Sequence, residues 1–395
     1  MARHGKLFLV IFVLWISVFH VTVHAESERV ISPKKYTAAY LTTQAQADSL
    51  DSLTAENDAH TFFQMKYTAD YKLDALLKAD IQNMEALAAW VQENLLKPGA
   101  VSDLMFGGGC SVFMAKNPEG KILCGRNYDQ EQNAQNILVH VVPGNGDYES
   151  YCTCAGGWIF QKGRIGRDEM DVSLLAAAPY LLMDGMNEKG LVVSVLQLDG
   201  RGTAQQTQGK NSIQTTVAMR LVLDRAASVE QALNLLTKYN MHSALPDVNF
   251  HFFFADASGH YCILEYEPEN GGVRAKGFFD ATDAFPACRD PKNTYRQVTN
   301  FYKLYKGHDD GSFGLERYNT IKKELKKHAY TLNEENAMQL LAKVRIARAA
   351  QWSVVYNSHD FTAKFCVKES IHDVKKKSKH RTYDYRLTFG KHEGL

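Results

Sequence analysis

The sequence lacks the features that mark several large classes of protein. Its 45 basic and 44 acidic residues leave a net charge of +1, which gives no reason to expect a nucleic-acid partner. After residue 25 it has no apolar run long enough to cross a bilayer, and it has no internal repeat. Cys152 and Cys154 are not followed by a second cysteine pair or by closely spaced histidines, which argues against a zinc site. We therefore expect neither a metal nor a cofactor.

The first 25 residues have the pattern of a secretory signal peptide. Arg3, His4 and Lys6 form a basic start, Leu7 to Val23 is an apolar run, and Val23-His24-Ala25 is a small-residue cleavage site. The run of 17 residues is near the lower limit for a membrane span, so an uncleaved membrane anchor is the alternative. We expect a secreted or periplasmic protein.

The seven cysteines are an odd number, which in an exported chain is compatible with up to three disulfides and one free thiol. Cys110 is the natural candidate for the free thiol. The sequence does not give the connectivity, and it is equally compatible with several reduced and buried cysteines.

Residues 26–109 differ in character from the rest of the chain. Glu26 to Asn57 is polar, whereas Tyr71 to Leu96 carries apolar residues at helical spacing, which predicts a helix that Lys97-Pro98-Gly99 ends. Residues 26–109 are either a helical subdomain or small subunit packed on the core, or a pro-segment that covers a site until it is cut.

The stretch before and after Cys110 has the character of a reactive site. Three consecutive glycines precede Cys110, and they give the backbone unusual freedom at an entropic cost that a purely structural loop rarely needs. An apolar hairpin follows, so that Arg126 and Asp129 return beside Cys110. The hairpin is predicted as a strand, a turn and a returning strand, at residues 111–115, 117–120 and 121–127.

Cys110 followed by a hairpin that ends in Gly125-Arg126-Asn127-Tyr128-Asp129 resembles the choloylglycine hydrolase superfamily. This superfamily includes bile salt hydrolases, penicillin V acylases, acid ceramidase and N-acylethanolamine amidase. The resemblance implies an N-terminal nucleophile hydrolase, in which the bond between Gly109 and Cys110 is cut and the new chain end carries both nucleophile and base.

The residues support such chemistry on physical grounds. A thiol needs a base or a lowered pKa to become a nucleophile near neutral pH. A free α-amino group has a pKa of roughly 7.7 to 8.0, which suits a general base, and only cleavage would give Cys110 such a group. Arg126 would hold the thiolate by its charge, and Asp129 would orient the new amine. The alternative is that Cys110 is a buried structural thiol.

A second resemblance to the same superfamily lies in Asp184-Gly-Met-Asn-Glu-Lys-Gly-Leu191. Family members carry an oxyanion-hole residue ten positions after this Asn, and that position is Gln197 here. Bile salt hydrolases have Asn there and penicillin V acylases have Tyr, so the chain departs from both. A Gln amide can still donate a hydrogen bond to an oxyanion.

The resemblance implies functional roles for two further residues. Val298 to Tyr302 matches the family's Thr-Asn segment, which implies that Asn300 is the other oxyanion donor. Arg317, in a helix predicted to open near Ser312, matches an arginine close to the nucleophile. The alternatives are an Asn that serves its own turn and an exposed Arg in a first helical turn.

The order of strands, two helices, strands, two helices and strands suits an α+β fold, a four-layer αββα sandwich with an N-terminal helical extension. The architecture itself is implied by the resemblance, which covers residues 110–395. His251 and His260 lie in or beside two apolar strands, where a histidine is more often structural than catalytic.

These observations predict an exported cysteine amidase that hydrolyses a linear carbon–nitrogen amide bond of a small N-acyl substrate. The alternatives are an acyltransferase of the same fold and a non-catalytic exported binding protein. A papain-type protease is disfavoured, since Cys110 is followed by Ser-Val. The sequence leaves open the acyl and amine groups, whether the pro-segment stays associated, and whether the chain forms a homo-oligomer.

Overall fold

The computed structural model describes residues 36–99, 109–130, 135–160, 164–166, 168, 170–287, 289–347, 349–369 and 379–390. The expected signal peptide, the glycines just before Gly109, and Cys288 lie outside these residues.

The predicted hairpin around Asn117 belongs to a six-stranded antiparallel sheet. Asn117 Oδ1 accepts a hydrogen bond from the Lys121 N–H at 2.8 Å, and Gly120 takes a φ of +84° that glycine adopts without strain. The strands, in their order across the sheet, are β16 (Gln297–Val298), β4 (Gly109–Lys116), β5 (Ile122–Asp129), β17 (Ala350–Asn357), β18 (Thr362–Lys368) and β19 (His380–Arg386).

The second large sheet has nine strands, and its neighbours are antiparallel except for the parallel pair of β3 and β6. A hairpin that turns across Asp256 to Gly259 joins two of its strands. In order across the sheet, the strands are β15 (Val273–Phe278), β14 (Tyr261–Tyr266), β13 (Val248–Ala255), β10 (Val192–Asp199), β9 (Leu182–Asn187), β7 (Ser150–Ala155), β6 (Asn136–Val141), β3 (Phe62–Tyr67) and β2 (Thr54–Ala55).

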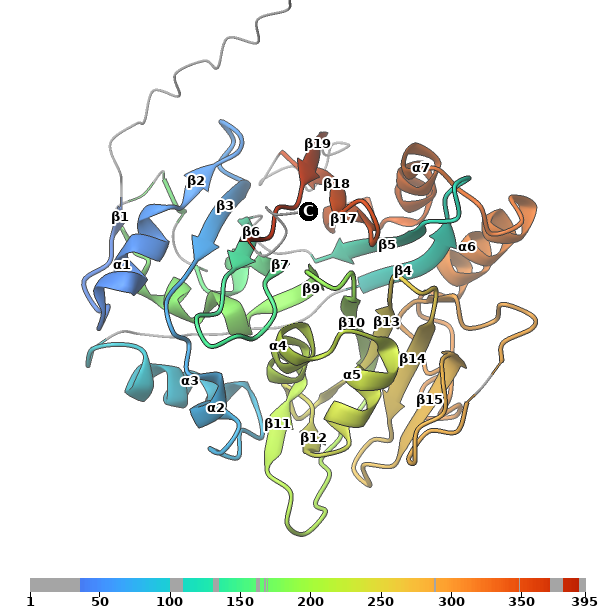
Figure 1. The fold of residues 1–395 in the computed structure, drawn as a ribbon, viewed down its shortest axis with the longest axis horizontal. Helices are drawn as coiled ribbons and strands as arrows, with labels where there is room; N and C mark the ends of the chain where they lie inside the picture. Colours follow the sequence, from blue (N-terminus) through green and yellow to red (C-terminus); the bar gives the residue numbers. More distant parts are fainter. Residues whose placement is uncertain are drawn as a thin grey trace, which may run out of the picture. The chain divides into compact units, whose positions relative to one another are not determined.

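Helix pairs cover the outer face of each sheet (Figure 1). Asn187 at the end of β9 donates to the Leu223 and Ala226 carbonyls, which fixes helix α4 on the nine-stranded sheet. Asn127 of β5 donates to the Leu341 carbonyl of helix α7 at 2.9 Å. The two sheets pack face to face, so the predicted α+β sandwich with four layers is confirmed. The helices are α4 (Thr215–Arg225), α5 (Val229–Leu236), α6 (Leu315–Lys327) and α7 (Glu334–Val344).

The N-terminal extension is helical only in part. Strand β3 is an integral member of the nine-stranded sheet, and contacts place Lys35–Leu395 in a single compact unit. The helix expected across Tyr71 to Leu96 is two helices, because Asp80 takes a φ of 55° and accepts the Ser212 N–H, and the chain turns there. Helices of the extension are α1 (Gln44–Asp51), α2 (Leu73–Leu76) and α3 (Met84–Asn94).

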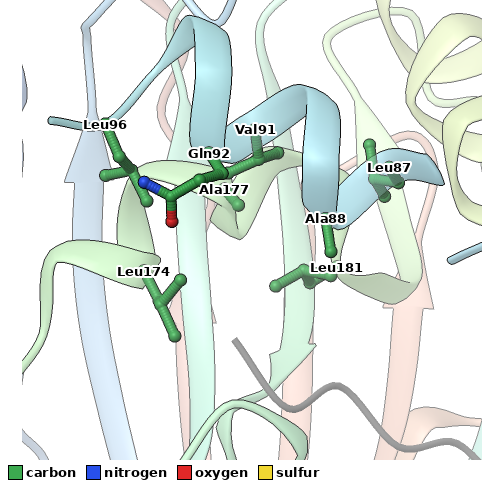
Figure 2. A pocket seen from close by; sticks show the side chains of 8 residues that line it. All are labelled: Leu87, Ala88, Val91, Gln92, Leu96, Leu174, Ala177 and Leu181. Atoms are coloured by element: carbon green, nitrogen blue, oxygen red, sulfur yellow. The ribbon is translucent and has the colours of Figure 1, made fainter. Parts of the chain in front are cut away.

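Several shorter elements complete the fold, and some of them contact the extension. Figure 2 shows a small apolar hollow between Leu87 and Val91 of α3 and Leu174 and Ala177 of the 3-10 helix η2. The remaining short elements are β1 (Tyr36–Thr37) paired with β8 (Met170–Asp171), β11 (Ser212–Gln214) paired with β12 (Asn240–His242), η1 (Gly156–Trp158) and η2 (Ser173–Tyr180).

All six cysteines within the described residues are free thiols, so three disulfides are not formed. Burial raises the pKa of Cys152 to about 12 and that of Cys154 still further. No helix in the described part of the chain is long and apolar enough to cross a membrane.

Candidate active site

Strand alternation divides the hairpin residues between two faces of the six-stranded sheet. Cys110 stands opposite Tyr128 in the register, so its side chain shares a face with Arg126, which is two residues from Tyr128. That face meets the nine-stranded sheet. Ser111 and Asp129 project to the other face, which the helices cover. The thiol and Arg126 are therefore brought together as predicted, whereas Asp129 approaches from the opposite side.

Arg126 is wholly buried between the two sheets and is held by several acceptors. Its Nε lies 3.3 Å from Asp184 Oδ2, and its Nη2 donates to the Val195 carbonyl at 2.9 Å. Burial works to lower the pKa of Arg126, but electrostatic interactions with Cys110 and Asp184 raise the pKa above its ordinary value. Arg126 therefore supplies a fixed positive charge beside the thiol.

Asp184 is the common acceptor that links the two sheets at this point. Besides Arg126, it accepts hydrogen bonds from Trp352 Nε1 at 3.0 Å and from the Tyr356 hydroxyl at 2.7 Å. Its side chain is fully buried, as is that of Arg126. The two donors on β17 and the ion pair together fix where the guanidinium lies relative to Cys110.

Asn300 binds the main chain of Cys110. Its Oδ1 accepts the Cys110 N–H at 2.6 Å and also a hydrogen bond from Arg317 Nη2 at 2.8 Å. Its Nδ2 donates to the Gln197 carbonyl at 2.8 Å. The two donors that meet Oδ1 set the orientation of the amide, and one Nδ2 proton is left for a further acceptor.

Arg317, on the first turn of α6, holds the other main-chain atom of Cys110. Its Nη1 donates to the Cys110 carbonyl at 2.5 Å and to Ser111 Oγ at 2.9 Å. Burial lowers the pKa of Arg317, while Asp129 and Cys110 act in the opposite direction. Asn300 and Arg317 together fix both polar main-chain atoms of the cysteine.

Gly314 leaves the space that Arg317 occupies. This glycine caps α6 with a φ of 85°, and a Cβ there would lie 2.7 Å from Arg317 Nη2 and 2.9 Å from Thr299 Oγ1. Thr299 Oγ1 donates to the Gly314 carbonyl, which ties the start of the helix to the residue before Asn300.

Asp129 lies beside the residue that precedes Cys110. It pairs with Gly109 across the hairpin, and its Oδ2 is 4.0 Å from Arg317 Nη1. Burial raises the pKa of Asp129 from 3.8 to about 7, although Arg317 and a main-chain contact at Ile346 oppose this shift. A carboxyl group that titrates near neutral pH therefore stands at the Gly109–Cys110 bond.

Gln197 contributes its main-chain carbonyl to Asn300. Ser194 stands opposite Asp184 and shares its face, so alternation along β10 directs the Gln197 side chain to the other face of the nine-stranded sheet. The oxyanion roles expected for the Gln197 and Asn300 amides stay predictions.

A comparison with models of known protein families identifies the family of the chain. Residues 110–312 match the family model of linear amide C-N hydrolases, choloylglycine hydrolase family. The matched range contains Cys110, Arg126, Asp129, Gln197 and Asn300 but ends before Arg317. The chain belongs to the choloylglycine hydrolase family. It is thus an N-terminal nucleophile hydrolase of the kind that hydrolyses non-peptide linear amides.

Solved structures similar to this choloylglycine hydrolase family member share little sequence with it. A variant of conjugated bile acid hydrolase from Clostridium perfringens is 14% identical, with a TM-score of 0.44 over 71% of this chain and 97% of that chain. Penicillin V acylase from Agrobacterium tumefaciens is 16% identical, with a TM-score of 0.45 over 71% and 92%. A Caenorhabditis elegans N-acylethanolamine-hydrolyzing acid amidase ortholog is 14% identical, with a TM-score of 0.38 over 69% and 99%. None of the curated proteins matches the sequence significantly.

The structure adds site residues to which sequence reasoning gave no role. Asp184 lies in a motif that carried the family resemblance, yet nothing local indicated that it would meet Arg126. Ser111 follows Cys110 directly, and the sequence indicated only that it would be the first residue of a strand. Their roles depend on pairing between distant strands, which periodicity does not encode.

One group of possible metal ligands occurs among the described residues, away from Cys110 in the sequence: Glu230, His260 and Asp280. Glu230 Oε1 is already engaged by His260 Nδ1 at 2.6 Å and by the Asp280 N–H at 2.7 Å. His260 therefore has the structural partner expected of it, and the expectation of no metal stays a prediction.

Proposed function

We propose that this choloylglycine hydrolase family member is an exported cysteine amidase whose nucleophile is Cys110. In this proposal the bond between Gly109 and Cys110 is cut, and the mature enzyme hydrolyses the linear amide bond of a small N-acyl substrate. The proposal goes beyond the family assignment in three respects: the choice of Cys110 as the nucleophile, the cleavage and the export.

One observation carries the proposal: side chains from distant segments hold both main-chain polar atoms of Cys110. A cysteine with only a structural role in the core needs no such side-chain contacts, because neighbouring strands normally form hydrogen bonds with its main-chain N–H and C=O groups. Here Asn300, just after β16, and Arg317, in the first turn of α6, both contact Cys110, and Arg126 shares the face of the thiol.

The cleavage step follows from these positions. The Cys110 sulfur attacks the Gly109 carbonyl carbon, the C–N bond breaks, and the Cys110 nitrogen takes a proton to become a free amine. Water then hydrolyses the thioester, which leaves Gly109 with a carboxylate and Cys110 with its thiol and a new α-amine.

Turnover repeats the same chemistry on a substrate. The α-amine accepts the thiol proton, the sulfur attacks the substrate carbonyl, and the amine passes the proton to the leaving group. Asn300 Oδ1 already binds the Cys110 nitrogen and would hold the amine in place, and Arg126 would stabilise the thiolate. Water releases the acyl group from the thioester.

The extension favours retention after cleavage. Strand β3 pairs with β6 over the whole of Phe62–Tyr67, and the Tyr71 hydroxyl donates to the buried Asp224 of α4 at 2.6 Å. Release of this segment would expose a sheet edge and would take the Tyr71 donor from the buried Asp224 carboxylate, which would keep its ion pair with Arg220. We therefore propose that the cut extension stays as an associated chain.

The test combines intact mass with turnover of fluorogenic amides. Wild type, Cys110→Ala and Cys110→Ser are compared with Cys366→Ala, a matched control because Cys366 is also a free thiol. Each protein is incubated with N-acyl amides of 7-amino-4-methylcoumarin that differ in acyl length. We expect wild type and Cys366→Ala to give a chain that begins at Cys110 and to release fluorescence, Cys110→Ser to be severely impaired in turnover, and Cys110→Ala to stay uncut and inactive.

Each alternative has its own outcome in this test. A processed and active Cys110→Ala protein ends the proposal. Wild type with Cys110 still internal, together with bound but unchanged amides, indicates a binding protein. Acyl transfer to an added amine in preference to water indicates an acyltransferase.

A further inference from the structure

The segment between β16 and α6, residues 299–314, contains Asn300 and leads into Arg317, the two residues that hold Cys110. Asn300 lies at its start, and Arg317 follows its end in the first turn of α6. The segment itself contains no helix or strand in the structure, and every one of its residues is described. Its geometry therefore depends on hydrogen bonds within the segment, such as that from the Tyr302 N–H to Asp309, and on contacts with the rest of the protein.

Glu265 on β14 is the deepest of these contacts. Its carboxylate accepts three successive main-chain N–H groups, from Lys303 at 2.7 Å, Leu304 at 2.6 Å and Tyr305 at 3.1 Å. His251 Nδ1 lies 3.1 Å from the same carboxylate, and since a carboxylate only accepts, His251 donates. The Glu265 side chain is wholly buried.

A carboxylate suits this position better than any neutral side chain. Four donors converge on its two oxygens, and consecutive main-chain N–H groups form a concave site for an anion. A Gln at this position would offer one acceptor oxygen and would turn its NH₂ group toward N–H donors.

The anchored residues are close to Asn300 along two routes. Along the chain, Lys303 is three positions after Asn300. Across the sheet, Glu265 pairs with His251, His251 pairs with Leu196, and the next residue, Gln197, binds Asn300 Nδ2 through its carbonyl. The sheet strands thus fix Asn300 directly and fix the segment that carries it.

We propose that Glu265 is a positioning residue, which acts through this segment to hold Asn300 against the Cys110 nitrogen. This inference rests on the proposed function, since it assigns Asn300 to the amine of the nucleophile. Loss of the anchor shifts Asn300 without removing any group that touches the substrate. A misplacement of about 1 Å at a reacting centre can cost on the order of a hundredfold in rate.

The test compares Glu265→Gln with Glu269→Gln. Glu269 lies four positions further along the chain, and its exposed carboxylate pairs with Arg201 at the surface. The full-length chains are assayed for Gly109–Cys110 cleavage and for kcat and KM on the coumarin amide that wild type turns over. We expect Glu265→Gln to lower the cleavage rate and kcat at least tenfold with KM within about twofold, and Glu269→Gln to match wild type. Wild-type kcat in folded Glu265→Gln overturns the inference.

Glu265→Asp covers the case in which Glu265→Gln does not fold. It keeps the charge but shortens the side chain, and we expect kcat between that of wild type and that of the Gln variant. Wild-type kcat in this variant also counts against positioning.

Hydrogen exchange separates failure of the inference from failure of the proposed function. The amides of Lys303, Leu304 and Tyr305 should exchange faster in Glu265→Gln than in wild type, whether or not wild type cleaves itself. Unchanged exchange overturns the anchor even in an inactive chain. Faster exchange in a wild-type chain that never cleaves keeps the anchor and rejects the amidase.

Discussion

Asn300 Oδ1 accepts the main-chain N–H of Cys110 across 190 positions of sequence, at 2.6 Å. The nitrogen it holds is the atom that cleavage would turn into the α-amine. A single amide thus orients the group that acts as the base in the proposed mechanism, and through Nδ2 it ties that group to β10.

Asn300→Ala should therefore slow self-cleavage and turnover together. Loss of one well-placed polar group at such a site typically costs about a hundredfold or more in rate. The rate is measured by intact mass as the Cys110 fragment forms after refolding from urea. Asn319→Ala, on the exposed side of α6, is the matched control and should cleave like wild type. Equal rates in both variants would remove Asn300 from the chemistry.

The local parts of the site follow from the sequence, and the long-range parts do not. The hairpin was predicted because its turn residues and apolar runs are contiguous, and β4 and β5 confirm it. The same pattern places Cys110 and Arg126 near each other. The sequence pattern could not show that Asp129 lies on the opposite face of the sheet. That required the register between β4 and β5 to be known to within one residue.

The errors in the extension have a similar physical cause. Apolar spacing from Leu73 to Val91 is helical, but the Asp80 contact to Ser212 interrupts the helix, and a partner 132 positions away leaves no local signal. The role of Asp184 was missed because its partners Trp352 and Tyr356 come from a strand near the end of the chain. Family resemblance located Asn300 and Arg317, whereas their contacts with Cys110 needed the structure.

Gly314→Ala should displace Arg317. A methyl group at this position would lie 2.7 Å from Arg317 Nη2, so the guanidinium must leave the Cys110 carbonyl or the helix must shift. Gly311→Ala is the matched control, because Gly311 also has a positive φ, of 67°, but nothing lies within 4 Å of its added Cβ. Both variants carry the strain of a positive φ, which is about 1 kcal/mol. Only Gly314→Ala should lose cleavage, and equal cleavage would show that the Arg317 contact is dispensable.

Asp184→Asn should destabilise the protein strongly. The change leaves Arg126 buried without its charge partner, and breaking a buried pair from one side typically costs about 3–5 kcal/mol. Asp360→Asn breaks a pair with Lys121 in which both side chains are substantially exposed, so solvent screens the pair and we expect a much smaller loss. Urea unfolding of both variants in the uncut Cys110→Ala background gives the two losses. Similar losses would mean that Asp184 does not hold a charged Arg126.

Asp129 should make the stability of the uncut chain depend on pH. Its folded pKa of about 7 lies above the ordinary 3.8, so folding favours the protonated form. Its contribution is therefore fully present below about pH 4, falls by up to about 1.4 kcal/mol per pH unit as the pH rises toward 7, and is level above that. Asp129→Asn, which stays neutral, should be the more stable protein at pH 8, with the advantage shrinking toward pH 4.

The measurement is urea unfolding from pH 4 to pH 8 in the Cys110→Ala background, with exposed Asp247→Asn as control. A flat difference between Asp129→Asn and its parent would mean that Asp129 is ionised throughout. In cleaved wild type the new ammonium at Cys110 would lie near Asp129 and favour its carboxylate, so the pH dependence should weaken once the chain is cut. Cleavage would then relieve the cost of an ionised Asp129 at neutral pH, and the same carboxyl group that burial penalises in the uncut chain would become a partner of the amine.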